Sequence, residues 1–151
     1  MEGRAMKRAT IRSKDAEEFI KQYTFEISKK DTVEIIDDKL MLINKAPAFF
    51  KYAGQWIPTL KLVAQKQILK TIVVDMGAIK FVINGADIMR PGILDIPQDL
   101  QKDECVCIVD ANNKKPIAVG LALLDGKAMQ ETKTGKVIKN IHYVGDEIWK
   151  S

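Results

Sequence analysis

The chain has 151 residues, of which 46% are hydrophobic and 29% charged, and its formal net charge is +4 at pH 7. A chain of this length can bury one ordinary core or two small cores that share an interface. No apolar stretch reaches the roughly 18 to 20 residues that a spanning helix needs, and the N-terminus lacks the apolar core of a signal peptide. We therefore expect a cytoplasmic protein with no membrane segment.

The positive charge is concentrated in the first half of the chain. Residues 1–72 hold 14 Lys and Arg against 9 Asp and Glu, giving +5, whereas residues 73–151 hold 10 against 11, giving −1. One interpretation is a basic arm that steers the chain towards phosphate. The alternative is a solvated terminus without a partner, and translation from Met6 would remove Arg4. The arm comprises Arg4, Lys7, Arg8, Arg12 and Lys14.

A helix is the first element that the sequence predicts. It follows Ser13, a residue type suited to a helix N-terminus, and acidic residues occupy its first turn. Apolar side chains then recur with helical spacing, which predicts a buried face. That face consists of Ala16, Phe19, Ile20 and Tyr23.

Strands are predicted next. The β-rich runs 31–36 and 40–43 flank Asp37-Asp38, a turn signal, and together predict a hairpin. A third strand is expected over residues 48–52, before Gly54 breaks it. A second helix should start at Ile57-Pro58-Thr59, and its inner side should carry Leu60, Val63, Ala64 and Gln67.

The second half opens with a predicted strand over residues 71–74 and a helix from about Gly77 to Asn84. Asp75 suits the N-terminus of this helix, and Gly85 can adopt the positive φ that ends it. Gly-rich turns with one Arg are common, so the turn at Arg90-Pro91-Gly92 does not by itself establish phosphate binding. The small or apolar face of the helix comprises Ala78, Phe81, Val82 and Gly85, and the other face carries Lys80, Ile83 and Asn84.

The remaining residues predict further short strands. Residues 104–110 and 117–124 should form a hairpin, residues 126–131 a helical turn, and residues 135–144 a last strand before the segment EIWK. Many short strands with few helices favour a small closed or half-closed barrel. Periodicity alone does not distinguish this barrel from a sandwich.

Catalytic and metal chemistry have little support in the sequence. Cys105 and Cys107 should share one face of a strand as buried thiols, and His142 is the only histidine. A zinc site would therefore need carboxylates or a second subunit, so we expect no metal. The adjacent pairs Asp37-Asp38 and Asp146-Glu147 are better suited to capping than to acid–base work. We read the chain as non-enzymatic and expect no cofactor.

Three segments, GAIKFV, GADIMRPGI and NIHYVGDEIW, with WIPTL upstream, resemble the PUA-domain family of translation re-initiation factors and their archaeal counterparts. The resemblance implies an α+β fold, in which a pre-PUA domain over residues 1–70 packs on a PUA pseudo-barrel over residues 71–151. It also implies RNA binding in translation initiation, re-initiation or recycling. The RNA would be the small ribosomal subunit or the acceptor end of transfer RNA.

The same resemblance nominates an RNA surface on the PUA helix, its Gly-Ala turn and the last strands. Lys80 and Arg90 would neutralise phosphate, Gly85 would permit close backbone approach, and Tyr143 would either stack on a base or pack in the core. Ile88 and Met89 are expected to be buried. The nominated residues are Gly77, Lys80, Asn84, Gly85, Ala86, Arg90, Lys139, Asn140, His142 and Tyr143.

A second hypothesis is a protein adaptor whose pre-PUA domain docks a translation factor. Exposed aromatic side chains at Trp56 and Phe49-Phe50 would favour it, although aromatic residues in an alternating strand are commonly buried. Salt distinguishes the two hypotheses, because RNA binding weakens steeply as salt rises and apolar docking does not.

Overall fold

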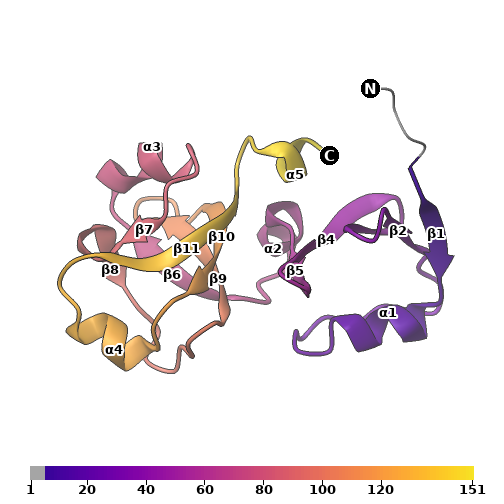
Figure 1. Cartoon of the computed structure of the whole chain (residues 1–151), viewed down its shortest axis with the longest axis horizontal. Coiled ribbons are helices and arrows are strands. Elements are labelled where there is room, and N and C mark those ends of the chain that lie inside the picture. The colour runs from indigo at the N-terminus through magenta and orange to yellow at the C-terminus, as the bar shows by residue number, and fades with distance from the viewer. Residues whose placement is uncertain (1–5) are drawn as a thin grey trace.

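The computed structural model describes residues 6–151 and contains two β-sheets that lie side by side along the long axis of the molecule (Figure 1). The first sheet has the strand order β1-β2-β3-β4-β5, and the second has the order β7-β11-β10-β9-β6-β8. Helices α2 and α5 lie between the two parts (Figure 1). The predicted α+β fold is confirmed.

The N-terminal unit is an antiparallel sheet with two short helices. The predicted hairpin is present, and its turn is built by Asp37 and Asp38, both with positive φ. The elements are β1 (Arg8–Ile11), α1 (Ser13–Phe19), β2 (Val33–Ile36), β3 (Leu40–Ile43), β4 (Ala46–Tyr52), β5 (Gln55–Pro58) and α2 (Leu60–Gln65).

Two edge strands of this unit differ from the sequence-based expectation. Strand β1 falls within the expected basic arm, and β5 falls where the second helix was expected to start. Both are four residues long and are held by a neighbouring strand, β1 by β2 and β5 by β4. The partner of β1 is distant in sequence, so a four-residue pattern does not reveal that strand. Strand β5 instead returns along β4 after a tight turn at Ala53-Gly54, both with positive φ, where the sequence reading took Gly54 only as the end of a strand. Helix α2 begins after Thr59, whose hydroxyl accepts a hydrogen bond from Leu62 N at 3.2 Å.

The predicted helix faces are partly wrong. Helix α1 starts at Ser13 itself and ends at Phe19, so it is shorter than its sequence pattern indicated. Ala16 and Ile20 are buried as expected, whereas Phe19 is 45% exposed and stacks on Trp56 with ring centroids 6.3 Å apart. In α2 and the residues after it, Ala64 and Gln67 are exposed, because the helix stops at Gln65 and only its first turns reach the core.

The C-terminal unit is a sheet that curves into a nearly closed barrel, as the resemblance implied. Its strands β6 and β9 are parallel and the other neighbours antiparallel. Its elements are β6 (Lys70–Val74), the 3₁₀ turn η1 (Met76–Ala78), α3 (Ile79–Val82), β7 (Ile88–Met89), the 3₁₀ turn η2 (Arg90–Gly92), β8 (Ile93–Asp95), β9 (Cys105–Asp110), β10 (Pro116–Ala122), α4 (Gly126–Glu131), β11 (Lys136–Tyr143) and α5 (Glu147–Lys150).

A shared hydrophobic core joins the two units. Phe50 and Leu60 of the N-terminal unit pack in one cluster with Cys107 and Val119 of the C-terminal unit. Both predicted buried cysteines are buried, and burial raises the pKa of the Cys107 thiol to about 12. The expected packed pair of units, without an exposed linker, is therefore present. The domain boundary at residues 70/71 stays a prediction, and β6 starts one residue before it.

Two phenylalanines of the N-terminal unit provide a matched test of this packing. Phe49 is fully buried, so Phe49→Ala should lower the free energy of unfolding by about 3–5 kcal/mol. Phe19→Ala should cost about 1 kcal/mol, because mainly the stack on Trp56 is removed. Urea unfolding of both variants measures the difference. Equal losses would contradict the packing described for α1.

Candidate nucleic-acid interface

The helical segment after β6 is short because it starts as a 3₁₀ turn. Asp75 caps it, since its Oδ1 accepts a hydrogen bond from Ala78 N at 2.9 Å. One turn of α-helix, α3, follows and ends at Val82, and the chain then turns through Gly85, whose φ is +91°. The predicted start and cap of this segment are thus confirmed, whereas the helix ends two residues before the predicted Asn84. Helix α3 lies at one end of the barrel (Figure 1).

A cleft of about 590 Å³ opens between this segment and the chain around β7 and η2. Phe81 at its edge is 58% exposed and Met89 is 49% exposed, although both were expected to face the core. Large apolar side chains left in water beside a cleft mark a binding surface. The lining residues are Asp75, Gly77, Ala78, Phe81, Val82, Ala86, Asp87, Ile88, Met89, Pro91, Gly92 and Lys136.

One lysine lines the cleft, and a second lies over the ring at its edge. Lys80 Nζ lies 5.2 Å from the centroid of the Phe81 ring, and Lys136 Nζ lies 2.9 Å from Asp87 Oδ2. Burial raises the pKa of Asp87, but hydrogen bonds from Lys136 and from Asn140 N, with the charges of Lys136 and Lys139, outweigh burial and hold this pKa below its ordinary value. The cleft therefore combines an exposed aromatic ring with a cationic rim, which is the combination that binds unpaired nucleotides.

Strand β11 packs against the Gly85 turn and donates hydrogen bonds to it. A Cβ on Gly85 would lie 3.1 Å from Tyr143 Cε1, so the close approach that this glycine permits is to Tyr143 within the fold. Asn140 Nδ2 donates to the carbonyls of Val82 and Ala86, each at 3.0 Å. Tyr143 also packs against the barrel core. These contacts give Gly85, Asn140 and Tyr143 structural roles beside the cleft.

Arg90 is occupied by hydrogen bonds within the protein. Its Nε donates to Met129 O at 2.8 Å, and its Nη1 donates to Ile93 O at 3.2 Å. The side chain thus ties the η2 turn to α4 and β8. The nominated phosphate contact would have to use the remaining guanidinium nitrogen, so Arg90 is a weaker candidate than the free lysines.

His142 does not belong to the cleft. Its side chain is 1% exposed and lies at the junction of the two units, where it contacts Leu60 N. A buried side chain cannot contact RNA without rearrangement, so His142 does not lie on the RNA surface for which it was nominated. The Arg90 side chain is bonded to α4 and β8. The remaining nominated residues gather at the α3 end of the barrel: Gly77, Lys80, Asn84, Gly85, Ala86, Lys139, Asn140 and Tyr143.

The described part of the proposed basic arm, around β1 and the start of α1, lies at the other end of the molecule from α3 (Figure 1). Its Arg8 is paired with Glu34 at 2.8 Å and its Arg12 with Asp15 at 3.1 Å, so neither guanidinium is free of an acidic partner. Lys7 is exposed, and Arg4 lies outside the described residues. The arm and the cleft cannot form one compact site.

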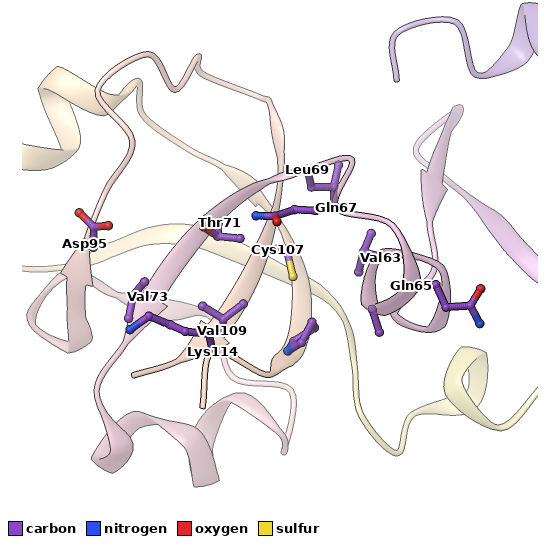
Figure 2. Close-up of a pocket in the computed structure, with 12 residues that line it drawn as sticks. Val63, Gln65, Gln67, Leu69, Thr71, Val73, Asp95, Cys107, Val109 and Lys114 are labelled. Carbon is purple, nitrogen blue, oxygen red and sulfur yellow. The ribbon is translucent and has the colours of Figure 1, made fainter. Parts of the chain in front are cut away.

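A second groove, of about 520 Å³, lies between the two units (Figure 2). Val63, Leu69 and Cys107 form apolar lining, and Thr71 and Lys114 add polar groups. None of the nominated residues lines it. Among residues 6–151, no group of three or more His, Cys, Asp or Glu could hold a metal ion, and no helix is long and apolar enough to cross a membrane.

Four residues of the cleft, Phe81, Met89, Asp87 and Lys136, do not follow from the sequence pattern. A regular 3.6-residue period places Phe81 on the inner face of the helix. The segment begins with three residues of 3₁₀ helix, whose period is about 3.0, and this rotates the following side chains. The one signal in the sequence was the short distance from the start of the helix to Asn84-Gly85, which leaves little room for a regular α-helix with a 3.6-residue period.

Comparison with known protein families gives two matches. The model of the PUA domain matches residues 70–144, and that of a domain of unknown function, DUF1947, matches residues 7–66. An uncharacterized protein of Methanocaldococcus jannaschii is 49% identical over 140 residues, covering 90% of this chain and 86% of that protein.

Two further relatives carry descriptive names. Translation machinery-associated protein 20 of Schizosaccharomyces pombe is 39% identical over 76% of this chain and 68% of that protein. The Malignant T-cell-amplified sequence 1 homolog of Drosophila melanogaster is 34% identical over 83% of this chain and 74% of that protein. A solved structure of a hypothetical protein from Pyrococcus horikoshii superposes with a TM-score of 0.82 at 29% identity, covering 95% of this chain and 98% of that one.

The packing of Gly85 against Tyr143 can be tested with a matched glycine. Gly135 has φ +90°, and a Cβ added to it would meet no atom within 4 Å, so Gly135→Ala should cost only backbone strain, roughly 1–2 kcal/mol. Gly85→Ala adds a clash with Tyr143 and should cost a further 1–3 kcal/mol or so. Thermal or urea unfolding measures both. Equal costs would show that the Tyr143 ring does not brace this turn.

Proposed function

The chain belongs to the family of PUA-domain proteins that includes Translation machinery-associated protein 20 and Malignant T-cell-amplified sequence 1, and on this basis we propose that it is a translation protein that binds structured RNA through the α3 cleft. The observation that carries the proposal is the half-exposed Phe81 ring beside a cleft with a lysine rim. The RNA would be the small ribosomal subunit or the acceptor end of transfer RNA.

The chemistry of the cleft favours an unpaired nucleotide over a duplex. Bases in an RNA duplex are hidden in a deep major groove, whereas an unpaired base exposes its face for stacking. Phe81 supplies that stacking surface, and Lys80 and Lys139 would neutralise the adjoining phosphates. Lys136 is less free, because it is paired with Asp87.

The proposed role lies in translation initiation, re-initiation or recycling in the cytoplasm. One relative is named Translation machinery-associated protein 20, which supports this class of role. We place no catalytic step in this function. The single imidazole is buried in contacts between the units, and burial raises the pKa of both thiols, which keeps them protonated and unreactive.

The second candidate function is protein docking through the N-terminal domain, and it would use a different surface from the aromatic residues first expected. Trp56, Phe49 and Phe50 are at most 5% exposed, so the expected aromatic anchors are buried. A groove of about 650 Å³ instead passes the half-exposed Phe19 and the edge of Trp56. This groove is the observation that favours docking of a ribosomal or translation-factor protein.

The RNA proposal predicts the effect of removing the Phe81 ring. Phe81→Ala should weaken binding to small ribosomal subunits or transfer RNA by roughly five- to 150-fold, because base stacking contributes about 1–3 kcal/mol. Phe81→Tyr keeps the aromatic face and should bind within about twofold of the wild type. Sedimentation with each RNA measures this. Equal binding by all three proteins would rule out stacking on this ring.

The lysine rim predicts a salt effect. Lys80→Ala/Lys139→Ala should weaken binding and lower the slope of log affinity against log salt by about one for each phosphate that the variant no longer neutralises. Lys29→Ala/Lys127→Ala removes the same charge from exposed positions before β2 and on α4, outside α3 and β11, and should leave the slope nearly unchanged. A similar change of slope in both double variants would indicate a diffuse charge effect.

A substitution of Phe19 tests the docking alternative. If small ribosomal subunits are bound through a protein contact in the Phe19 groove, Phe19→Asp should abolish sedimentation with them, and binding should respond little to salt. Under the RNA proposal, Phe19→Asp should bind like the wild type. The two functions thus predict opposite results from one variant.

A further inference from the structure

His142, the only histidine in the chain, is hydrogen-bonded at both of its ring nitrogens, and one of these two bonds connects the two domains. It lies on β11 of the PUA domain, and its Nε2 is 3.1 Å from Leu60 N at the start of α2 in the N-terminal domain. Its Nδ1 is 2.9 Å from Asp146 Oδ2. A backbone N–H can only donate and a carboxylate can only accept, so Nε2 must carry the lone pair and Nδ1 the proton.

The groups around the ring hold this arrangement. Asp146 also accepts hydrogen bonds from Tyr143 N and Trp149 N, each at 2.9 Å, and so caps α5. The Phe50 ring packs against the imidazole edge-on, with centroids 5.2 Å apart. Leu60 N is one of the free donors at the start of α2, and His142 is its acceptor.

We propose that His142 is a pH-sensitive latch between the two domains: the neutral ring holds α2 on the PUA barrel, and its protonation releases that hydrogen bond. Protonation would place an N–H on Nε2, directly facing the N–H of Leu60. Two donors cannot bond, and Leu60 N would be left unpaired in a buried site. The latch goes beyond RNA binding, because it concerns how the two domains are held relative to each other.

The groups near the imidazole shift its pKa in opposite directions. Burial lowers the pKa of His142, Asp146 raises it and Lys61 of α2 lowers it, and the net result lies below the ordinary value. The undocked state therefore binds more protons than the docked state as pH falls below about 6.5. Docking is fully favoured above that pH and weakens as pH falls towards the pKa of the docked ring.

Because the chain has one histidine, its state can be read directly by long-range ¹H–¹⁵N NMR of the imidazole. The latch predicts a neutral ring at about pH 7.5 with the proton on Nδ1, and a pKa below about 6.5. A proton on Nε2 at that pH, or a pKa at or above the ordinary value, would overturn the proposal.

Domain orientation gives the second readout. Residual dipolar couplings should fit one common alignment for both domains at about pH 7.5 and separate alignments at about pH 5. In His142→Gln the amide oxygen can accept from Leu60 N, the amide nitrogen can donate to Asp146, and neither titrates, so the common alignment should persist at both values.

A wild-type protein that keeps one alignment at about pH 5, or a His142→Gln variant that loses it there as the wild type does, would contradict the latch. If the variant does not fold, the wild-type couplings and the imidazole spectrum decide the matter without it.

Discussion

Strand β11 supports both the α3 cleft and the interface between the two domains. Its Asn140 and Tyr143 brace the Gly85 turn beside the α3 cleft, and its His142 accepts the N–H of Leu60 in the other domain. The strand can do both because it belongs to the barrel and its C-terminal end contacts α2. A disturbance in β11 would therefore affect the cleft and the domain interface together.

The cleft and the domain interface use their side chains differently. At the interface, apolar residues such as Phe50 and Leu60 are buried, and the one polar ring is fully hydrogen-bonded. At the cleft, Phe81 and Met89 remain in water although the fold gains nothing from their exposure. The proposed ligand, an unpaired nucleotide, has both a planar apolar face and negative charge, and so would match exposed apolar groups beside lysines.

Much of the fold could be predicted from the sequence, because alternating runs and turn signals are local. The hairpin of β2 and β3 and the segment from Asp75 to Gly85 are examples. Strand β1 could not, because its partner β2 is distant in sequence, whereas β5 follows a tight turn at Ala53-Gly54 that was read only as a strand break. Site residues were harder still: the resemblance nominated a surface, but the contacts of Arg90 with α4 and of His142 with α2 join segments that are distant in sequence.

The most direct test of RNA binding at the cleft is a ¹⁵N NMR titration of the whole protein with a transfer RNA acceptor-stem hairpin that carries an unpaired 3′ end. Binding of an unpaired nucleotide at the cleft predicts shifts concentrated in residues 76–92 and 136–143, with weaker shifts for the same hairpin made blunt-ended. Shifts confined to residues 7–66, or equal shifts with both hairpins, would contradict it.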